Sequence, residues 1–181
     1  MAKVFSLRCS RDSGRIFYRL DVSHEKTIRA LGITLPLPPK PVASYVPAVR
    51  AGALLFLSGM LPFRDGKLTI EGKLGKDVTV EQGYEAAKTA ALNALAVVRQ
   101  AIGSLDRVKQ VIKMVGHVAC ADGFIQQPAV VNGASDFLVA VFGEAGRHAR
   151  VAVGAAELPL NAPIEIELII EVEGETMPHS T

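Results

Sequence analysis

The chain has 181 residues, of which 49% are hydrophobic and 21% charged, a composition that fits one globular domain and excludes disorder, collagen and coiled coil. A formal net charge of +2 provides no general field for nucleic acid or for an anionic membrane. The two cysteines, Cys9 and Cys120, form neither a disulfide framework nor a Cys-x-x-Cys motif, which indicates a reducing compartment and a cytoplasmic protein.

The first 23 residues differ from the rest in charge. They hold five basic residues against Asp12 and Asp21, and they lack the long apolar run of a secretory signal. Arginine and serine with few acids are compatible with organellar targeting, which stays as an alternative, whereas the absence of turn signals and periodicity favours disorder. We therefore expect a basic extension over residues 1–27 and a single domain over residues 28–181.

The elements expected next are extended. Five prolines between Leu35 and Pro47 predict a stiff lead-in rather than a helix. Residues 54–61 have the apolar character of a buried strand, and Asp65-Gly66 is typical of a hairpin turn that leads into residues 67–70. The charge-free stretch over residues 51–63 is shorter than the ~20 apolar residues of a membrane-spanning helix, so we expect no membrane partner.

The pattern becomes helical at Thr79. Thr79 and Gln82 fit a capping box, and apolar residues then recur at helical spacing until Gly103. A second helix is predicted over residues 132–142, where four apolar residues form its stripe: Ala134, Phe137, Leu138 and Val141.

Three further strands are predicted. Residues 108–120 form the first, in which alternation puts four residues on one face: Ile112, Met114, Val118 and Cys120. Residues 150–158 and 163–173 follow as an antiparallel hairpin. In the last strand, aliphatic residues alternate with glutamates, which indicates one apolar and one acidic face.

This order predicts an α+β fold in which two helices cover one face of a mixed or antiparallel sheet. The other sheet face must be solvated or buried against another subunit. Three small residues on the Arg150 face of their strand favour close approach by a partner chain: Ala152, Gly154 and Ala156.

Several kinds of site are excluded by spacing. The four histidines show no metal-ligand spacing, no phosphate-binding loop has its Ser/Thr, and no Gly-x-Ser-x-Gly motif is present. Arg150 beside strand N–H groups suits a carboxylate clamp, with a structural ion pair as the alternative. Glu165 and Glu167 would lie about 7 Å apart along a strand, which fits either a glycosidase pair or a solvated acidic face.

Five short segments carry a family resemblance: Tyr45-Val46-Pro47, Leu57-Ser58-Gly59, Val131-Asn132-Gly133-Ala134, Arg150 with Leu158-Pro159, and Glu165-Ile166-Glu167. In this order and spacing they resemble the Rid/YjgF family of reactive-intermediate deaminases, from about Leu31 to Val172. The chain looks like the branch of that family with the segments Leu31–Pro36, Asn132–Ser135 and Gly146–Arg150.

The resemblance implies a homotrimer of chorismate mutase-like subunits with ligand sites in the clefts between them. It also implies hydrolysis of 2-imino acids, formed from enamines such as 2-aminoacrylate, to 2-keto acids and ammonia, with no cofactor or metal. The family's carboxylate-binding arginine falls on Arg150 and its water-activating glutamate on Glu165. The remaining cleft-lining positions of the family fall on Tyr45, Ser58, Gly59 and Asn132.

The chain departs from the family pattern at Ala152, where cysteine is frequent; the backbone N–H there can still bind a carboxylate. The interval between Asn132 and Arg150 is about one residue longer than in well-known members, and nothing before His24 matches. In the predicted hairpin, Glu165 lies opposite Ala156, about 20 Å along the strand from Arg150. We therefore expect the two side chains to meet only between subunits.

Two alternatives to a deaminase stay open. The same cleft could serve a non-catalytic trimer that senses a small carboxylate, although Glu165 favours turnover. Relatives are also described as endoribonucleases or translation inhibitors, but the chain after the basic arm is slightly acidic and has no aromatic and basic stripe, which disfavours nucleic acid.

Overall fold

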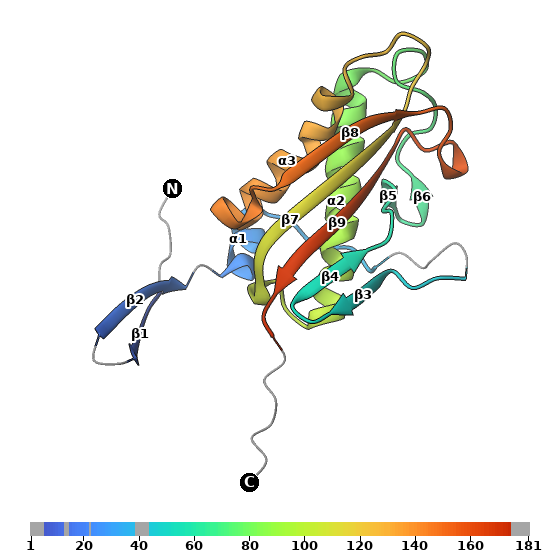
Figure 1. The fold of residues 1–181 in the computed structure, drawn as a ribbon. Helices are drawn as coiled ribbons and strands as arrows, with labels where there is room; N and C mark the ends of the chain where they lie inside the picture. Colours follow the sequence, from blue (N-terminus) through green and yellow to red (C-terminus); the bar gives the residue numbers. More distant parts are fainter. Residues whose placement is uncertain (1–5, 13–14, 22, 39–43, 175–181) are drawn as a thin grey trace.

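A computed structural model describes residues 6–12, 15–21, 23–38 and 44–174 (Figure 1). The helices are α1 (His24–Ala30), α2 (Val80–Ile102) and α3 (Gln127–Phe142), with short 3-10 turns η1 (Leu105–Arg107), η2 (Gly143–Gly146) and η3 (Pro159–Asn161). The strands are β1 (Ser6–Asp12), β2 (Arg15–Asp21), β3 (Ala48–Ala51), β4 (Leu54–Leu57), β5 (Phe63–Arg64), β6 (Lys67–Leu68), β7 (Val108–Ala119), β8 (Ala149–Ala155) and β9 (Ile164–Val172).

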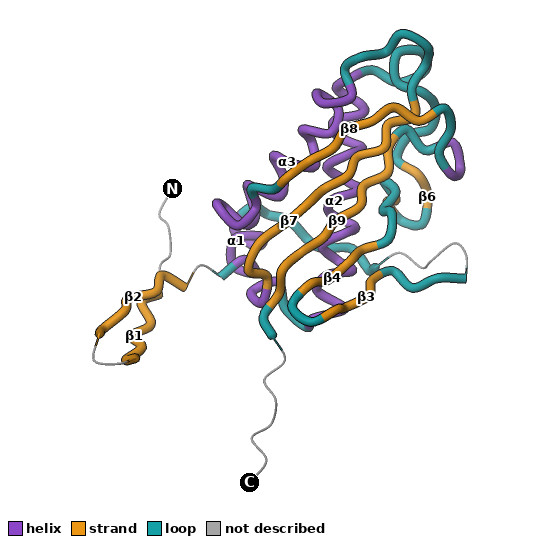
Figure 2. The backbone as a smooth tube through the Cα atoms, viewed as in Figure 1, coloured by secondary structure: helices purple, strands orange, loops and turns teal. Residues whose placement is uncertain are grey.

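The main sheet has five strands in the order β3-β4-β9-β7-β8. α2 and α3 lie on one face of this sheet, and no element that the structure describes covers the other face, named here the open face (Figure 2). The α+β architecture with a mixed sheet and a single helix layer is confirmed.

The predicted hairpin of the last two strands is wrong. β8 pairs in parallel with β7, and β7 pairs antiparallel with β9, so β7 separates β8 from β9. The strand, helix and strand formed by β7, α3 and β8 make a crossover unit, which places the second strand parallel to the first. The connection between β8 and β9 contains η3 and crosses from one neighbour of β7 to the other.

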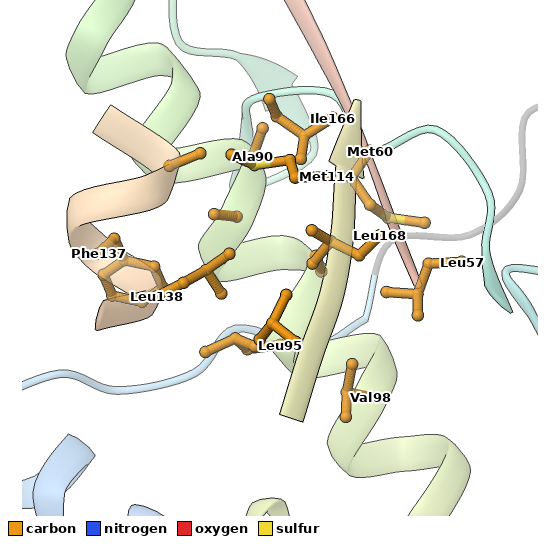
Figure 3. Packing of buried hydrophobic residues seen from close by; sticks show 14 of the residues in the cluster. Leu57, Met60, Ala90, Leu95, Val98, Met114, Phe137, Leu138, Ile166 and Leu168 are labelled. Atoms are coloured by element: carbon orange, nitrogen blue, oxygen red, sulfur yellow. The ribbon is translucent and has the colours of Figure 1, made fainter. Parts of the chain in front are cut away.

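The core lies between the sheet and the two long helices (Figure 3). Met114, Ile166 and Leu168 of the sheet face Ala90 and Leu95 of α2, and all five are fully buried or nearly so. The predicted capping box of α2 is present, since Thr79 Oγ1 accepts a hydrogen bond from Gln82 N and Gln82 Oε1 accepts one from Thr79 N. The helix ends at Gly103, as expected.

β7 departs from simple alternation. Two register shifts against β9 bring Val108, Val111 and Met114 to the core side, and Ile112 is 38% exposed. The prediction that Ile112 shares a face with Met114 is therefore wrong, because a β-bulge inserts an extra residue and reverses the side on which the following residues point.

Two other elements differ from their expected limits. α3 begins at Gln127, five residues ahead of the predicted start, with Pro128 in its first turn where a proline loses no helical hydrogen bond. Its predicted apolar stripe is buried. The Asp65-Gly66 turn is present, but it joins β5 to β6. The preceding strand β4, expected to lead into this turn, pairs with β3 and β9 instead.

Residues ahead of position 28 also pack against the domain. Ser23 caps α1, and the buried His24 ring meets Phe142 of α3 edge-on, 4.8 Å between ring centroids. The part of the extension that the structure describes forms the antiparallel hairpin β1-β2, and the sequence between these strands is Ser13-Gly14, a pair typical of turns. Within the described ranges, no helix combines the length and the apolar character that crossing a bilayer requires.

Candidate functional site

The first group of candidate residues surrounds the Arg150 guanidinium, at the edge strand β8. Arg150 Nη1 donates to Asn132 Oδ1 at 2.8 Å and to Ser135 Oγ at 3.0 Å, and Nη2 donates to the Pro128 carbonyl at 3.4 Å. All three partners lie on α3, and positions three apart on a helix share a face, which is why Asn132 and Ser135 reach the same nitrogen. The side chain of Arg150 therefore points to the helix side of the sheet.

The arginine keeps one edge for a ligand. Both hydrogens of Nη1 are used, whereas Nε–H and the second hydrogen of Nη2 meet no acceptor among the residues that the structure describes. Nε and Nη2 lie on the edge by which a guanidinium binds a carboxylate side-on through two parallel hydrogen bonds. The arrangement favours the clamp over the structural ion pair, because no described carboxylate lies against Arg150.

The second group lies at the open face, where the chain after β4 meets β9. Met60 and Ile166 exchange backbone hydrogen bonds, which places Gly59 against Glu165. A Cβ atom at Gly59 would lie 1.8 Å from Glu165 Oε1, so only glycine leaves room for this carboxylate. Ser58 Oγ donates to the Val46 carbonyl at 2.8 Å, which brings the segment with the exposed Tyr45 alongside.

The surroundings of Glu165 disfavour its charged form. Burial raises the pKa of the Glu165 carboxyl group above its ordinary value; His117 opposes this increase and Glu167 adds to it. His117 is the register partner of Glu165 on β7, and its Nε2 lies 2.8 Å from Glu167 Oε1. A carboxylate with a raised pKa beside an open surface suits proton transfer to and from water.

The Arg150 and Glu165 side chains do not meet within one chain. Arg150 pairs with Met114 and Glu165 with His117, so they are three residues apart along β7, roughly 10 Å, and two strand spacings apart across the sheet, also roughly 10 Å. They also point to opposite faces of the sheet. The expected 20 Å separation assumed that β8 and β9 form a hairpin, which is wrong. Arg150 and Glu165 are nevertheless apart, because β7 lies between their strands and their side chains point to opposite faces.

The small residues beyond Arg150 contact their own chain. Ala152 packs against the core, and a Cβ at Gly154 would lie 2.9 Å from Cys120 Sγ and 3.2 Å from Gln127 Nε2. These contacts within the chain are enough to explain why residue 154 is small, without close approach by a partner chain. Val151 and Val153 of the same strand point to the open face and are 43% and 40% exposed.

Two other site types find little support. In the part of the chain that the structure describes, no cluster of three or more His, Cys, Asp or Glu side chains could hold a metal ion. Both glutamates lie next to His117, but Glu167 is bonded to its ring and Glu165 is packed against Gly59. With one carboxylate already engaged by His117, the arrangement does not favour a glycosidase pair that flanks one space.

Ser135 and His148 were not among the predicted site residues. Ser135 contacts Arg150 directly, and His148 contacts Ser135. Burial holds the pKa of His148 below its ordinary value; the hydrogen bond to the Gly146 carbonyl opposes this decrease and the Arg150 guanidinium adds to it. The signal was available, because Ser135 lies three residues after Asn132 on a helix and His148 two residues before Arg150.

The sequence matches the YjgF/chorismate mutase-like endoribonuclease family over residues 25–172. Among curated proteins it is 42% identical to Protein TCP17 of Trypanosoma cruzi over 146 residues, which are 80% of this chain and 91% of that protein. It is 32% identical to a 2-iminobutanoate/2-iminopropanoate deaminase of Dermatophagoides farinae over 141 residues, which are 78% of this chain and 95% of the relative.

Solved structures agree with this match. The fold superposes on a candidate endoribonuclease from Shewanella oneidensis with a TM-score of 0.81 and 38% sequence identity, covering 83% of this chain and 99% of that one. The described domain is therefore similar to these proteins over nearly their whole length.

Proposed function

Because the chain belongs to the YjgF/chorismate mutase-like family, we propose that it hydrolyses 2-imino acids, formed from enamines such as 2-aminoacrylate, to 2-keto acids and ammonia. The observation that carries this proposal is the Arg150 guanidinium, fixed on one side by α3 and open on the other for a carboxylate. The similarity to a protein named as an imine deaminase supports the substrate class.

The proposed chemistry divides between the two groups of residues. Arg150 holds the substrate carboxylate, and positioning of this kind supplies much of the rate gain. Glu165 takes a proton from a water molecule whose oxygen attacks the imine carbon, and the carbon–nitrogen double bond becomes single. Glu165 then returns the proton to the nitrogen, and the remaining carbon–nitrogen bond breaks. Ammonia leaves as the hydroxyl oxygen gives up its proton to water and becomes the carbonyl oxygen of the keto acid. The protonated imine is itself a strong electrophile, so the step as written needs no further group.

The proposal requires more than one subunit. Since Arg150 and Glu165 point to opposite faces of their own sheet, one small substrate can reach both only if they come from different chains. The open face offers apolar side chains that a partner would bury, listed here with their exposed fractions: Val49 55%, Phe56 40%, Ile112 38%, Val151 43% and Val153 40%. A homotrimer, in which each cleft takes Arg150 from one chain and Glu165 from the next, satisfies this requirement.

The decisive experiment is release of ammonia and keto acid from 2-imino acids generated in situ by an amino-acid oxidase. Wild-type protein should accelerate hydrolysis, and Arg150→Ala should not. Arg147→Ala is the matched control, because Arg147 is an exposed arginine three residues away that pairs with Glu144. Unchanged kcat/KM in Arg150→Ala would remove Arg150 from the site.

A binding role is the outcome to distinguish. If the wild type accelerates no imine but binds 2-oxobutanoate in an Arg150-dependent way, the same groups serve a carboxylate-binding protein. Retained binding with lost turnover in Glu165→Gln would instead support the enzyme.

A further inference from the structure

Behind Arg150, a chain of hydrogen bonds runs away from the proposed cleft into the protein. Ser135 Oγ lies 3.0 Å from Arg150 Nη1 and 3.1 Å from His148 Nε2. His148 Nδ1 lies 2.6 Å from the Gly146 carbonyl oxygen. The three side chains are half-buried. Ser135 lies on α3, Arg150 on β8 and His148 directly before β8.

The chemistry of the end groups fixes the direction of every bond in this chain. A carbonyl oxygen can only accept, so His148 Nδ1 carries a hydrogen and donates to Gly146. In the neutral ring Nε2 then accepts, and the donor is the Ser135 hydroxyl. A guanidinium can only donate, so a lone pair of the same hydroxyl accepts from Arg150.

We propose that Ser135 and His148 are positioning residues that hold the Arg150 guanidinium with its free edge toward the substrate carboxylate. This inference rests on the proposed function. Arginine has many rotamers, and fixing them before the ligand arrives removes a cost that would otherwise reduce affinity. Without Ser135, the guanidinium would keep only the bond from Nη1 to Asn132 and the long 3.4 Å bond from Nη2 to the Pro128 carbonyl. Ser135 adds a second short bond to Nη1, which restricts rotation of the guanidinium plane.

His148 gives Ser135 its orientation. Without an acceptor at Nε2, the Ser135 hydrogen would turn toward another acceptor, such as a carbonyl of its own helix, and the lone pair would leave Arg150. The hydroxyl is thus useful to Arg150 only while His148 accepts from it. Neither residue touches the substrate in this arrangement.

The kinetic test compares Ser135→Ala and His148→Leu with wild type. Each should raise KM for a 2-imino acid roughly tenfold, the size expected for loss of one hydrogen bond to a charged group, and change kcat by less than about twofold. His148→Gln keeps an acceptor near the Nε2 position and Ser135→Thr keeps the hydroxyl, so both should retain most of the affinity. Asp136→Asn, on the same helix but bonded to Tyr84, should leave KM unchanged.

A double-variant comparison separates positioning from a general structural effect. In an Arg150→Ala background, adding Ser135→Ala should cause no further loss of 2-oxobutanoate affinity, because the group to be positioned is gone. An equal loss in both backgrounds, or an unchanged KM in Ser135→Ala, would overturn the proposal.

Nuclear magnetic resonance of ring nitrogens provides a readout that does not need activity. His148, assigned from the signals lost in His148→Gln, should be in the neutral Nδ1–H tautomer in wild type. An Nε2–H tautomer would overturn the bond directions. If wild type hydrolyses no imine, the proposed function fails, but the His148 tautomer and 2-oxobutanoate binding still test this inference. If wild type is active and Ser135→Ala has the same KM, this inference fails and the proposed function stands.

Discussion

At the scale of single residues, Gly59 controls the space that the Glu165 carboxylate occupies. The atoms that a Cβ would meet are the outer atoms of the Glu165 side chain, at 1.8, 2.5 and 2.8 Å, and a flexible side chain can move away from them. A larger residue at position 59 would therefore displace the Glu165 carboxylate but would disturb the fold little. Activity and stability should separate at this position.

Gly59→Ala is expected to lower kcat by roughly a hundredfold or more, the contribution of a positioned general base, with little change in melting temperature. The physical reason is displacement of Glu165, which can be measured by imine hydrolysis together with thermal unfolding. Gly174→Ala is the control, because its Cβ would meet nothing within 4 Å. Full activity in Gly59→Ala would show that Glu165 need not lie where the structure has it.

Glu165→Gln should be inactive yet more stable than wild type at neutral pH. Because burial raises the pKa of Glu165, the folded state binds this proton more tightly than the unfolded chain, and stability falls as pH rises through the folded pKa. The glutamine carries no charge, so its advantage should be present above the raised pKa and vanish below the pKa of the unfolded chain. Denaturant unfolding at several pH values tests this, and a variant less stable at pH 7 would contradict it.

At the scale of elements, the approach of α3 to α2 sets the position of the arginine group. A Cβ at Gly133 would lie 1.9 Å from the Tyr84 carbonyl oxygen, and that backbone atom cannot move without moving α2. Asn132 and Ser135 flank this contact on α3, so the helix spacing and the positions of both Arg150 partners depend on it.

Gly133→Ala should lower the free energy of unfolding by about 1–3 kcal/mol, the usual cost of overpacking, and should also raise KM because Asn132 and Ser135 move with α3. Denaturant unfolding and steady-state kinetics on one preparation measure the two effects. Val139→Ala, on the exposed side of the same helix, serves as the control for a change in side-chain volume. An unaltered KM in a destabilised Gly133→Ala protein would separate the helix spacing from the site.

At the scale of the whole molecule, the open face and the opposed orientation of the two groups favour the same assembly. A sheet with one uncovered face and exposed valines and phenylalanine on it resembles half of an interface. If the clefts form between chains, association and activity should be lost together, and activity should be shared between chains.

Phe56→Asp places a charge on the open face beside Ile169 and should dissociate the assembly, with loss of turnover and a preserved circular dichroism spectrum. Sedimentation velocity gives the oligomeric state. Val139→Asp puts the same charge on the exposed side of α3 and should leave both properties unchanged. A fully active Phe56→Asp monomer would contradict sites shared between chains.

Mixing chains gives the most direct test of shared sites. Arg150→Ala and Glu165→Gln are each inactive alone, but random mixed trimers contain clefts with both native residues, so roughly a quarter of wild-type activity should return after equal mixing and reassembly. Arg150→Ala mixed with the double variant should stay inactive. No recovery in reassembled mixtures would mean that each cleft draws both residues from one chain.

The sequence by itself determined those helix ends and strand faces that depend on residues only a few positions apart. The capping box at Thr79 and Gly103 fix both ends of α2, and the alternation of β9 separates its apolar and acidic faces, because each of these depends on residues within a few positions. The family resemblance named Arg150, Glu165 and Gly59 as candidate site residues; these assignments stay predictions, although the structure does place Gly59 against Glu165.

Only the tertiary structure decided how these elements are placed. The insertion of β7 between β8 and β9, the bulge that turns Ile112 outward and the opposed faces of Arg150 and Glu165 depend on pairing between residues distant in the sequence. The contact of Ser135 with His148 depends on the packing of α3 against β8. Local propensity carries no information about which strand becomes a neighbour, since that choice is made by the burial of the whole sheet against its helix layer.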